Sequence, residues 1–362
     1  MTGKRKSLWI LGIVGVCFLW MFGHTTKTEA AEKDKIPPKF NYQVVFPDNQ
    51  MKEDIGYYHL KMKTGQKQQV KIEFTNLGEE KTSFDISLNS AKTNSNGVIE
   101  YGDTNIKNDD SLKFDFKEIV TAPKKLEVAA GETKELAIDI KMPDTSYDGI
   151  ISGGIQIIQN GQNEVEENNG SMVLNEYAYV VGMILQETDT KVTPKLKLNT
   201  VLPGQSNYKN TLYVNYSNLE AEYVRNMTTE VQITQKGKSA VLFEKKQTNM
   251  KMAPNSFINF PVDMAGERMV AGDYSATILV TADEGINEKW TMDFSISQEE
   301  ADKFNERDVN LTQETGINWK LIIVCVLALF VLFLLILRLI IIIKKRNKEQ
   351  ENNKKVHKKR KK

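Results

Sequence analysis

An alternation of apolar and polar side chains runs through most of the chain and constrains its fold most strongly. Successive side chains of a β-strand point to opposite faces, so such runs predict half-buried strands. Residues with turn chemistry, such as Asn96-Gly97 and Ala271-Gly272, separate the runs. The alternating runs are Val70–Phe74, Phe84–Leu88, Leu136–Ile140, Leu196–Leu198, Leu212–Tyr216, Val231–Ile233, Tyr274–Val280 and Trp290–Ile296. Many short strands of this kind predict an all-β chain built from β-sandwiches.

The strands divide into two sets around the polar, acidic stretch 160–170, which suits either a linker or an exposed hairpin. The two sets resemble one another. The letters FTNL at 74–77 end a strand in the first set, and YSNL at 216–219 end a strand in the second. We therefore predict two tandem β-sandwiches, at 40–160 and 172–298.

A long apolar run close to the C-terminus, Leu321–Ile343, predicts a membrane span. Its 23 residues form about 34 Å of helix, enough to cross a hydrocarbon core of about 30 Å. Arg338 lies near the end of the run, where its side chain can reach the lipid headgroups. We predict a transmembrane helix at 320–343.

The charges on either side of this helix predict its orientation. Residues 344–362 hold eleven Lys and Arg against two Glu, which marks a cytoplasmic tail by the positive-inside rule and places the preceding residues outside the cell. We expect this tail to be disordered and to contact anionic lipid headgroups. Residues 299–319 are expected to form a juxtamembrane stalk, with helical character in the charged stretch Gln298–Arg307.

The N-terminus has the three parts of a secretory signal peptide. Lys4-Arg5-Lys6 precede the apolar run Leu8–Phe22, and small residues follow around Ala30. We predict a signal peptide at 1–31; the alternative is an uncleaved signal anchor, for which the apolar run is short.

Cysteine usage and charge narrow the location and the partners. The two cysteines, Cys17 and Cys325, lie in the predicted signal peptide and membrane helix, so the predicted extracellular part has none. A cysteine-free exported domain is typical of a bacterial surface. Because the positive charges gather at the two ends, residues 32–319 are net acidic, which argues against a nucleic-acid partner.

Residues with catalytic or metal-binding chemistry are sparse. His59 is the single histidine of the predicted extracellular part, and that part has no cysteine. The sequence therefore supports neither a His-based triad nor a thiol nucleophile. Carboxylates are numerous, but no pair of them stands out as a glycosidase site. One acidic cluster suits either a calcium site or a solvated loop, although it lacks the spacing of a calcium loop. Its members are Asp103, Asp109, Asp110 and Asp115. We expect no cofactor, no metal and no enzymatic activity.

Several segments, in a characteristic order, resemble the WxL-interacting proteins of Gram-positive bacteria. In the first predicted sandwich they are FPDNQ at 46–50, MKTGQKQQVKIEFTN at 62–76, SAKTNSNGVIEY at 90–101 and YDGIISGGI at 147–155. In the second they are AYVVGMILQE at 178–187, EYVRNM at 222–227, MAPNS at 252–256 and AGDYSATI at 271–278. The terminal layout of signal peptide, C-terminal helix and basic tail also matches.

This resemblance implies an adhesion function at the cell surface. It implies two immunoglobulin-like sandwiches, the first associating with peptidoglycan and the second with a WxL-domain surface protein or host extracellular matrix. The rival hypotheses are a cell-wall hydrolase with sandwich scaffolding and a purely structural surface stalk.

Two groups of residues are candidates for binding. Asn94, Asn96, Gly97 and Tyr101 form either a polar–aromatic sugar contact or a hairpin turn in which Asn-Gly supplies positive φ and Tyr101 is packed. The pair Gly153-Gly154 either allows the close approach of another backbone or forms a β-bulge. In both cases the purely structural interpretation is preferred.

Overall fold

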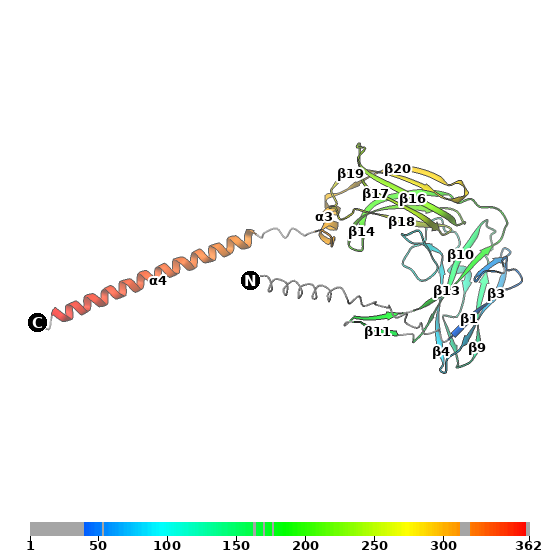
Figure 1. Ribbon diagram of the computed structural model, residues 1–362, viewed down its shortest axis with the longest axis horizontal. Coiled ribbons are helices and arrows are strands. Elements are labelled where there is room, and N and C mark those ends of the chain that lie inside the picture. The colour runs from blue at the N-terminus through cyan, green and yellow to red at the C-terminus, as the bar shows by residue number, and fades with distance from the viewer. Residues whose placement is uncertain are drawn as a thin grey trace, which may run out of the picture.

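The computed structural model describes residues 40–52, 54–161, 164–168, 171–175, 177–311 and 319–359. These residues form two β-sandwiches and a long C-terminal helix (Figure 1), as the alternating runs predict. The predicted signal peptide at 1–31 lies outside the described residues.

The first sandwich packs two sheets face to face. One sheet has the order β1 (Phe40–Val45), β3 (Lys67–Asn76), β9 (Thr133–Lys141) and β7 (Val120–Thr121). The other has the order β2 (Tyr58–Lys61), β13 (Ala178–Gln186), β10 (Ile150–Gln159), β4 (Thr82–Ser90) and β8 (Lys125–Val128). Alternation places Val70, Ile72 and Phe74 of β3 in the core. The ring centroid of Phe84 lies 5.0 Å from that of Phe74 and 4.8 Å from that of Phe40, so aromatic contacts join the sheets.

The second sandwich is built in the same way. Its first sheet has the order β14 (Leu196–Ser206), β15 (Lys209–Asn218) and β18 (Ser256–Asp263). Its second sheet has the order β17 (Val241–Met252), β16 (Val224–Gln235), β19 (Gly272–Thr281) and β20 (Asn287–Ile296), with the short helix η1 (Asp283–Gly285) before β20. Tyr216 is fully buried between the sheets, and its hydroxyl lies 2.7 Å from Thr229 Oγ1, which satisfies the polar end of this core side chain.

One strand lies in a different sandwich from the one expected. We placed 178–186 in the second sandwich, but β13 pairs antiparallel with β10 and parallel with β2, both in the first. Its Val181, Met183 and Leu185 are buried in the first core. The reason is local: the hairpin of β11 (Glu164–Asn168) and β12 (Ser171–Asn175) connects β10 directly to β13. The acidic stretch around 160–170 therefore contributes a strand to this hairpin, and the chain passes between the sandwiches at 187–195.

The segment expected to begin a stalk also belongs to the second sandwich. Helix α3 (Gln298–Arg307) begins with a capping box between Ser297 and Glu300. Its Asn305 is buried and exchanges two hydrogen bonds of 2.7 Å with the backbone of Met269. Just beyond the helix, Asp308 Oδ2 accepts a 2.6 Å bond from the Asn210 backbone. These polar contacts, with the packing of Ala301 and Phe304 against the core, fix α3 on the sandwich, although six of its ten residues are charged.

The C-terminal helix α4 (Trp319–Lys359) contains the predicted apolar span. Within the described part of the chain, Ile322–Arg346 is the one helical segment long and apolar enough to cross a membrane, which agrees with the prediction at 320–343. The helix continues into the basic tail to Lys359, where we expected disorder. Lys, Glu and Gln in this tail are good helix formers, and they extend the helix already begun in the apolar run.

Candidate functional site at the junction of the two sandwiches

The connection from β4 to β7, residues 91–119, lies against the second sandwich; we call it the junction loop. It contains the two-stranded hairpin β5 (Lys92–Thr93) and β6 (Ile99–Glu100) and the short helix α2 (Phe116–Ile119). At the hairpin tip, the carbonyl of Gly97 accepts a 2.7 Å hydrogen bond from Lys251 N, and the carbonyl of Asn96 accepts one of 2.7 Å from Gln247 Nε2. Both donors lie on β17, so the first sandwich binds the edge of the second.

Thr93 anchors the other strand of this hairpin in the second sandwich. Its Oγ1 accepts a 2.9 Å bond from Ala253 N and lies 2.6 Å from Ser256 Oγ. All three residues are buried. A buried polar group is costly unless it is paired, so these bonds fix the register of one sandwich on the other.

The candidate residues Asn94, Asn96 and Gly97 form the turn of this hairpin. Asn94 Oδ1 accepts hydrogen bonds from the backbone of Asn96 (2.9 Å) and Val98 (3.1 Å), and Gly97 has φ of 68°, as the hairpin interpretation requires. A Cβ on Gly97 would lie 2.6 Å from Met250 Cβ. Glycine is therefore needed at 97 both for backbone conformation and for close approach to the second sandwich.

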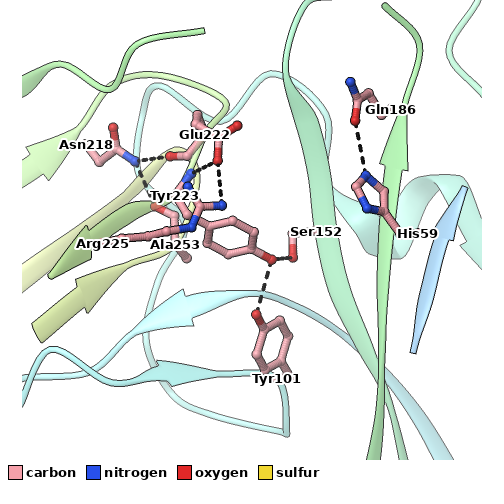
Figure 2. Close-up of polar contacts among 9 residues, drawn as sticks. All are labelled: His59, Tyr101, Ser152, Gln186, Asn218, Glu222, Tyr223, Arg225 and Ala253. Atoms are coloured by element: carbon pink, nitrogen blue, oxygen red, sulfur yellow. Dashed lines mark hydrogen bonds and ion pairs between the residues drawn. The ribbon is translucent and has the colours of Figure 1, made fainter. Parts of the chain in front are cut away.

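Tyr101 points from the junction loop into a three-hydroxyl cluster between the sandwiches (Figure 2). Its hydroxyl lies 3.1 Å from that of Tyr223, which in turn lies 2.5 Å from Ser152 Oγ. Burial raises the pKa of Tyr223 well above its ordinary value, and the neighbouring Tyr101 adds to this effect. The phenol of Tyr223 therefore stays protonated, and it joins β10 and the junction loop to the second sandwich.

A rigid turn in the second sandwich holds Tyr223 in place. Glu222 Oε1 accepts from Arg225 Nη2 at 3.0 Å and from Tyr223 N at 2.8 Å, and the guanidinium of Arg225 lies 5.2 Å from the centroid of the Tyr223 ring. Asn218 Nδ2 donates to the carbonyls of Glu222 (2.7 Å) and Ala253 (3.1 Å) (Figure 2). The side chain of Asn218 thus ties the turn to the chain at Ala253, next to Thr93.

The preferred prediction for Gly153-Gly154 is wrong. Strand β10 pairs with β13 and β4 in unbroken register through both glycines, so there is no bulge there. A Cβ on Gly153 would lie 2.3 Å from the Phe116 ring, and one on Gly154 would lie 2.7 Å from Tyr101 Cβ. The glycines allow the close approach of another chain segment, which is the alternative interpretation; that segment is the protein's own junction loop.

A further glycine of the same motif contacts the second sandwich directly. Gly149 has φ of 88°, and a Cβ there would lie 2.3 Å from the carbonyl oxygen of Ala221. The same oxygen accepts a 2.8 Å hydrogen bond from Ile150 N. This contact joins backbone to backbone across the junction and tolerates only glycine at 149.

A cavity of about 710 Å³ lies beside these contacts and is lined by both sandwiches. Its wall includes Phe114 and Tyr147, whose ring centroids are 5.5 Å apart. Polar atoms come from Asp148 of the first sandwich and from Glu220 and Asn255 of the second. The lining is more polar than that of an ordinary small-molecule pocket, but the cavity lies at a domain interface, where ligand sites often occur.

Two members of the acidic cluster at 103–115, Asp109 and Asp115, accept hydrogen bonds within the protein. Asp109 Oδ2 accepts from Ser217 Oγ at 2.5 Å, which is another contact between the sandwiches. Asp115 caps α2, accepting from Lys117 N at 3.0 Å, and also accepts from Ser90 and Asn108. Burial opposes its ionisation, but these bonds hold the pKa of Asp115 below its ordinary value. Among the described residues, no three His, Cys, Asp or Glu side chains are grouped as metal ligands.

Lys92 supplies the positive charge of this network. It is buried, with 7% of its surface exposed, and its ammonium group donates to Asn108 Oδ1. Burial lowers the pKa of Lys92, while the nearby Asp115 carboxylate opposes that shift. The bond of Lys92 with Asn108 joins two parts of the junction loop, and the bond of Asp115 with Ser90 attaches the loop to β4 of the first sandwich.

His59 lies away from the junction, on the edge strand β2. Its Nε2 is 3.1 Å from Gln186 Oε1 (Figure 2), and its Nδ1 is buried with no hydrogen-bond partner among the described residues. The histidine contacts an amide of the neighbouring strand, which is a packing arrangement.

Sequence reasoning alone did not identify Tyr223, Ser152, Thr93 and Ala221 as parts of this site. Tyr223 lies in the motif EYVRNM, Ser152 in YDGIISGGI and Thr93 in SAKTNSNGVIEY. The motifs were therefore the available signal, but only the fold brings them together. Segments that look like separate signatures in the sequence are the two sides of one junction.

Taken together, these features define a protein with two coupled β-sandwiches followed by an apolar helix. Residues 40–159 match the model of the WxL Interacting Protein peptidoglycan binding domain, and residues 168–306 match that of the WxL Interacting Protein host binding domain. The two matches cover well over half of the chain in the expected order, so it belongs to the WxL Interacting Protein family. This family is one of cell-surface binding proteins with these two domains.

Solved structures show distant likenesses. PapD-like domain 7 of human CEP192 is 11% identical, with 46% of this chain and 99% of that chain covered and a TM-score of 0.27. The CupB2 chaperone of Pseudomonas aeruginosa is 13% identical, with 63% and 93% covered and a TM-score of 0.24. The CsuC–CsuE chaperone–tip adhesion subunit complex of Acinetobacter baumannii is 12% identical, with 64% and 93% covered and a TM-score of 0.29. No curated protein matches the chain.

Proposed function

We propose that this chain is a membrane-anchored protein that links peptidoglycan to a surface ligand, either a WxL-domain protein or host extracellular matrix. The observation that carries the proposal is the junction: a peptidoglycan binding domain and a host binding domain are joined by buried hydrogen bonds and backbone contacts. A ligand held by one domain is then mechanically connected to a ligand held by the other.

The orientation is part of the proposal. The predicted N-terminal signal peptide and the basic tail support an extracellular pair of sandwiches and a cytoplasmic C-terminus. Because α3 belongs to the second sandwich, that sandwich lies next to the membrane helix in the chain, and the first sandwich is the more distant one. This order suits wall binding by the first sandwich.

A groove of about 490 Å³ on the first sandwich, lined by both polar and apolar side chains, is our candidate for the wall contact. It lies beside β3, β7 and β9, and its lining includes Gln69, Asp139 and Lys141. Gln69 Nε2 donates to Asp139 Oδ1 at 2.9 Å. Amide, carboxylate and ammonium groups of this kind can bind sugar hydroxyls and stem peptides. Lys67 and Glu118 extend the polar wall.

Pelleting with purified sacculi tests the proposal. The protein should pellet with sacculi without releasing muropeptides, and should do so at high salt, because an acidic protein must rely on specific contacts in an anionic wall. Gln69→Ala with Asp139→Ala should weaken pelleting. The matched control is Lys81→Ala with Glu127→Ala, an exposed ion pair of 2.6 Å on the other sheet. Released muropeptides would favour the hydrolase, and wild-type protein left in the supernatant would contradict wall binding.

A further inference from the structure

The end of the second sandwich that carries α3 exposes three apolar side chains. Tyr208, Val270 and Val309 are 69%, 61% and 67% exposed. They come from three separate segments, namely the β14–β15 turn, the loop before β19, and the chain just after α3. Figure 1 shows α3 beside β14 at this end of the sandwich.

Contacts between the three segments place these side chains on one surface. Val309 N donates a 3.0 Å hydrogen bond to the carbonyl of Tyr208. Asn305, one turn earlier in α3, is bonded to Met269, the neighbour of Val270. A Cβ on Gly266 would lie 3.9 Å from Asn310 Cβ. We call this the α3-end surface: Tyr208, Val270 and Val309 with the exposed cations Lys209, Arg268 and Arg307.

Tyr208 occupies a backbone conformation that favours other residues. Ser206 and Lys209 pair across a two-residue turn in which Asn207 and Tyr208 have φ of 50° and 59°. Such turns strongly prefer glycine at the second position, because a side chain with positive φ is strained. The tyrosine ring is not buried, so packing does not offset this strain. A strained and exposed aromatic side chain points to a function outside the folding of the sandwich.

The chain holds this surface close to the membrane helix. The described residues end at Leu311 and resume at Trp319, and eight peptide steps span at most about 28 Å. Tyrosine is enriched where lipid headgroups meet water, and Lys and Arg attract anionic headgroups. Glu267, Glu306 and Asp308 lie in the same region and balance the three cations, so the apolar side chains matter most.

We propose that the α3-end surface docks on the bilayer that holds α4, with Tyr208 inserted among the lipid headgroups. This inference rests on the proposed membrane anchoring. Docking would set the tilt of both sandwiches, because the junction makes them one unit. The host binding domain would then stand on the membrane rather than swing on a tether.

Fluorescence quenching in nanodiscs tests the docking. The mature chain, residues 32–362 with Cys325→Ala, is placed in discs of phosphatidylglycerol and phosphatidylcholine that carry a nitroxide on the headgroup. A fluorophore is attached at Glu267→Cys, on the α3-end surface but distant in sequence from α4. The control position is Asn287→Cys, at the start of β20 and so at the other end of the same sandwich. Docking predicts strong quenching at 267 and little at 287.

Substitutions then test the surface itself. Tyr208→Ser with Val270→Ser and Val309→Ser should reduce quenching at 267 to the level at 287. The control triple variant, Val45→Ser with Met51→Ser and Leu77→Ser, removes exposed apolar side chains of the first sandwich and should leave quenching unchanged. Tyr208→Gly alone relieves the positive-φ strain, so it should keep or raise the melting temperature while lowering the quenching. This combination would not arise if Tyr208 served only to stabilise the fold.

The failures are distinguishable. A chain that does not elute with the discs contradicts the proposed anchoring by α4. A chain that elutes with them but shows equal quenching at 267 and 287, or quenching unaffected by the Tyr208 variants, contradicts the docking alone.

Discussion

Single hydroxyl groups and single glycines hold the two sandwiches together. Tyr223 is buried at 8% exposure, and it contacts Tyr101 and Ser152, which belong to the other sandwich. Removing its hydroxyl leaves those partners with unmet hydrogen bonds in a buried site. Tyr223→Phe should therefore lower the free energy of unfolding by about 1–2 kcal/mol, measured by urea denaturation. Tyr208→Phe, at an exposed tyrosine, is the control and should change it little.

The raised pKa of Tyr223 gives this residue a pH signature. The folded state holds the phenolic proton more tightly than the unfolded state, whose tyrosines titrate near pH 10. Its contribution to stability is thus complete below about pH 10 and is lost as pH rises from there towards the folded pKa. Urea denaturation should be measured at one pH below 10 and one above it. Between the two, the free energy of unfolding should fall further in the wild type than in Tyr223→Phe. Equal losses would show that the hydroxyl is not shielded at the junction.

Gly149 can be compared with a glycine that also has a positive φ but has different surroundings. Both Gly149 and Gly131 have positive φ, at 88° and 69°, but nothing lies within 4 Å of a Cβ at 131. Gly131→Ala should show the cost of backbone strain alone. Gly149→Ala should cost at least about 1 kcal/mol more, because its methyl group collides with the Ala221 carbonyl. Similar losses in thermal or urea unfolding would mean that the junction yields easily at this point.

At the scale of elements, β13 decides where the first sandwich can be divided from the second. A fragment ending at 160 lacks β13 and leaves β2 and β10 without their shared neighbour. It should therefore aggregate or stay unfolded, whereas a fragment of 32–190 should show a cooperative unfolding transition by circular dichroism. Equal transitions for the two fragments would show that β13 is dispensable.

Helix α3 offers a second test at this scale. Asn305→Ala removes both bonds to Met269, so α3 should loosen and the free energy of unfolding should fall by about 2–3 kcal/mol. Asp302→Ala, at an exposed position on the same helix, is the control. Hydrogen exchange should show faster exchange around 298–308 in Asn305→Ala only. Protection unchanged there would indicate that other contacts hold the helix.

These elements also show how much of the fold can be predicted from the sequence alone. Alternation predicted the strands of β3, β15 and β19 because a buried face leaves a period of two. Alternation in β13 could not say which sheet it joins, since any half-buried strand has the same pattern. Asn305 gave no signal either, because its bonds go to backbone atoms of a distant loop. The candidate residues at 94–101 and 153–154 were found through motifs, but their shared position at the junction depends on tertiary contacts.

At the scale of the whole molecule, the junction makes a definite prediction about rigidity. The peptide link at 187–195 alone would let the sandwiches reorient, whereas the buried contacts of Thr93, Tyr223 and Gly149 oppose this motion. Spin labels at Glu79→Cys in the first sandwich and Lys289→Cys in the second, in the mature chain with Cys325→Ala, should therefore give a single narrow distance distribution. Gly149→Val should broaden it by forcing the backbones apart, and Gly131→Val should not. A broad distribution in the wild type would mean that the two domains act independently, so that a load on the host binding domain would not pass rigidly to the peptidoglycan binding domain.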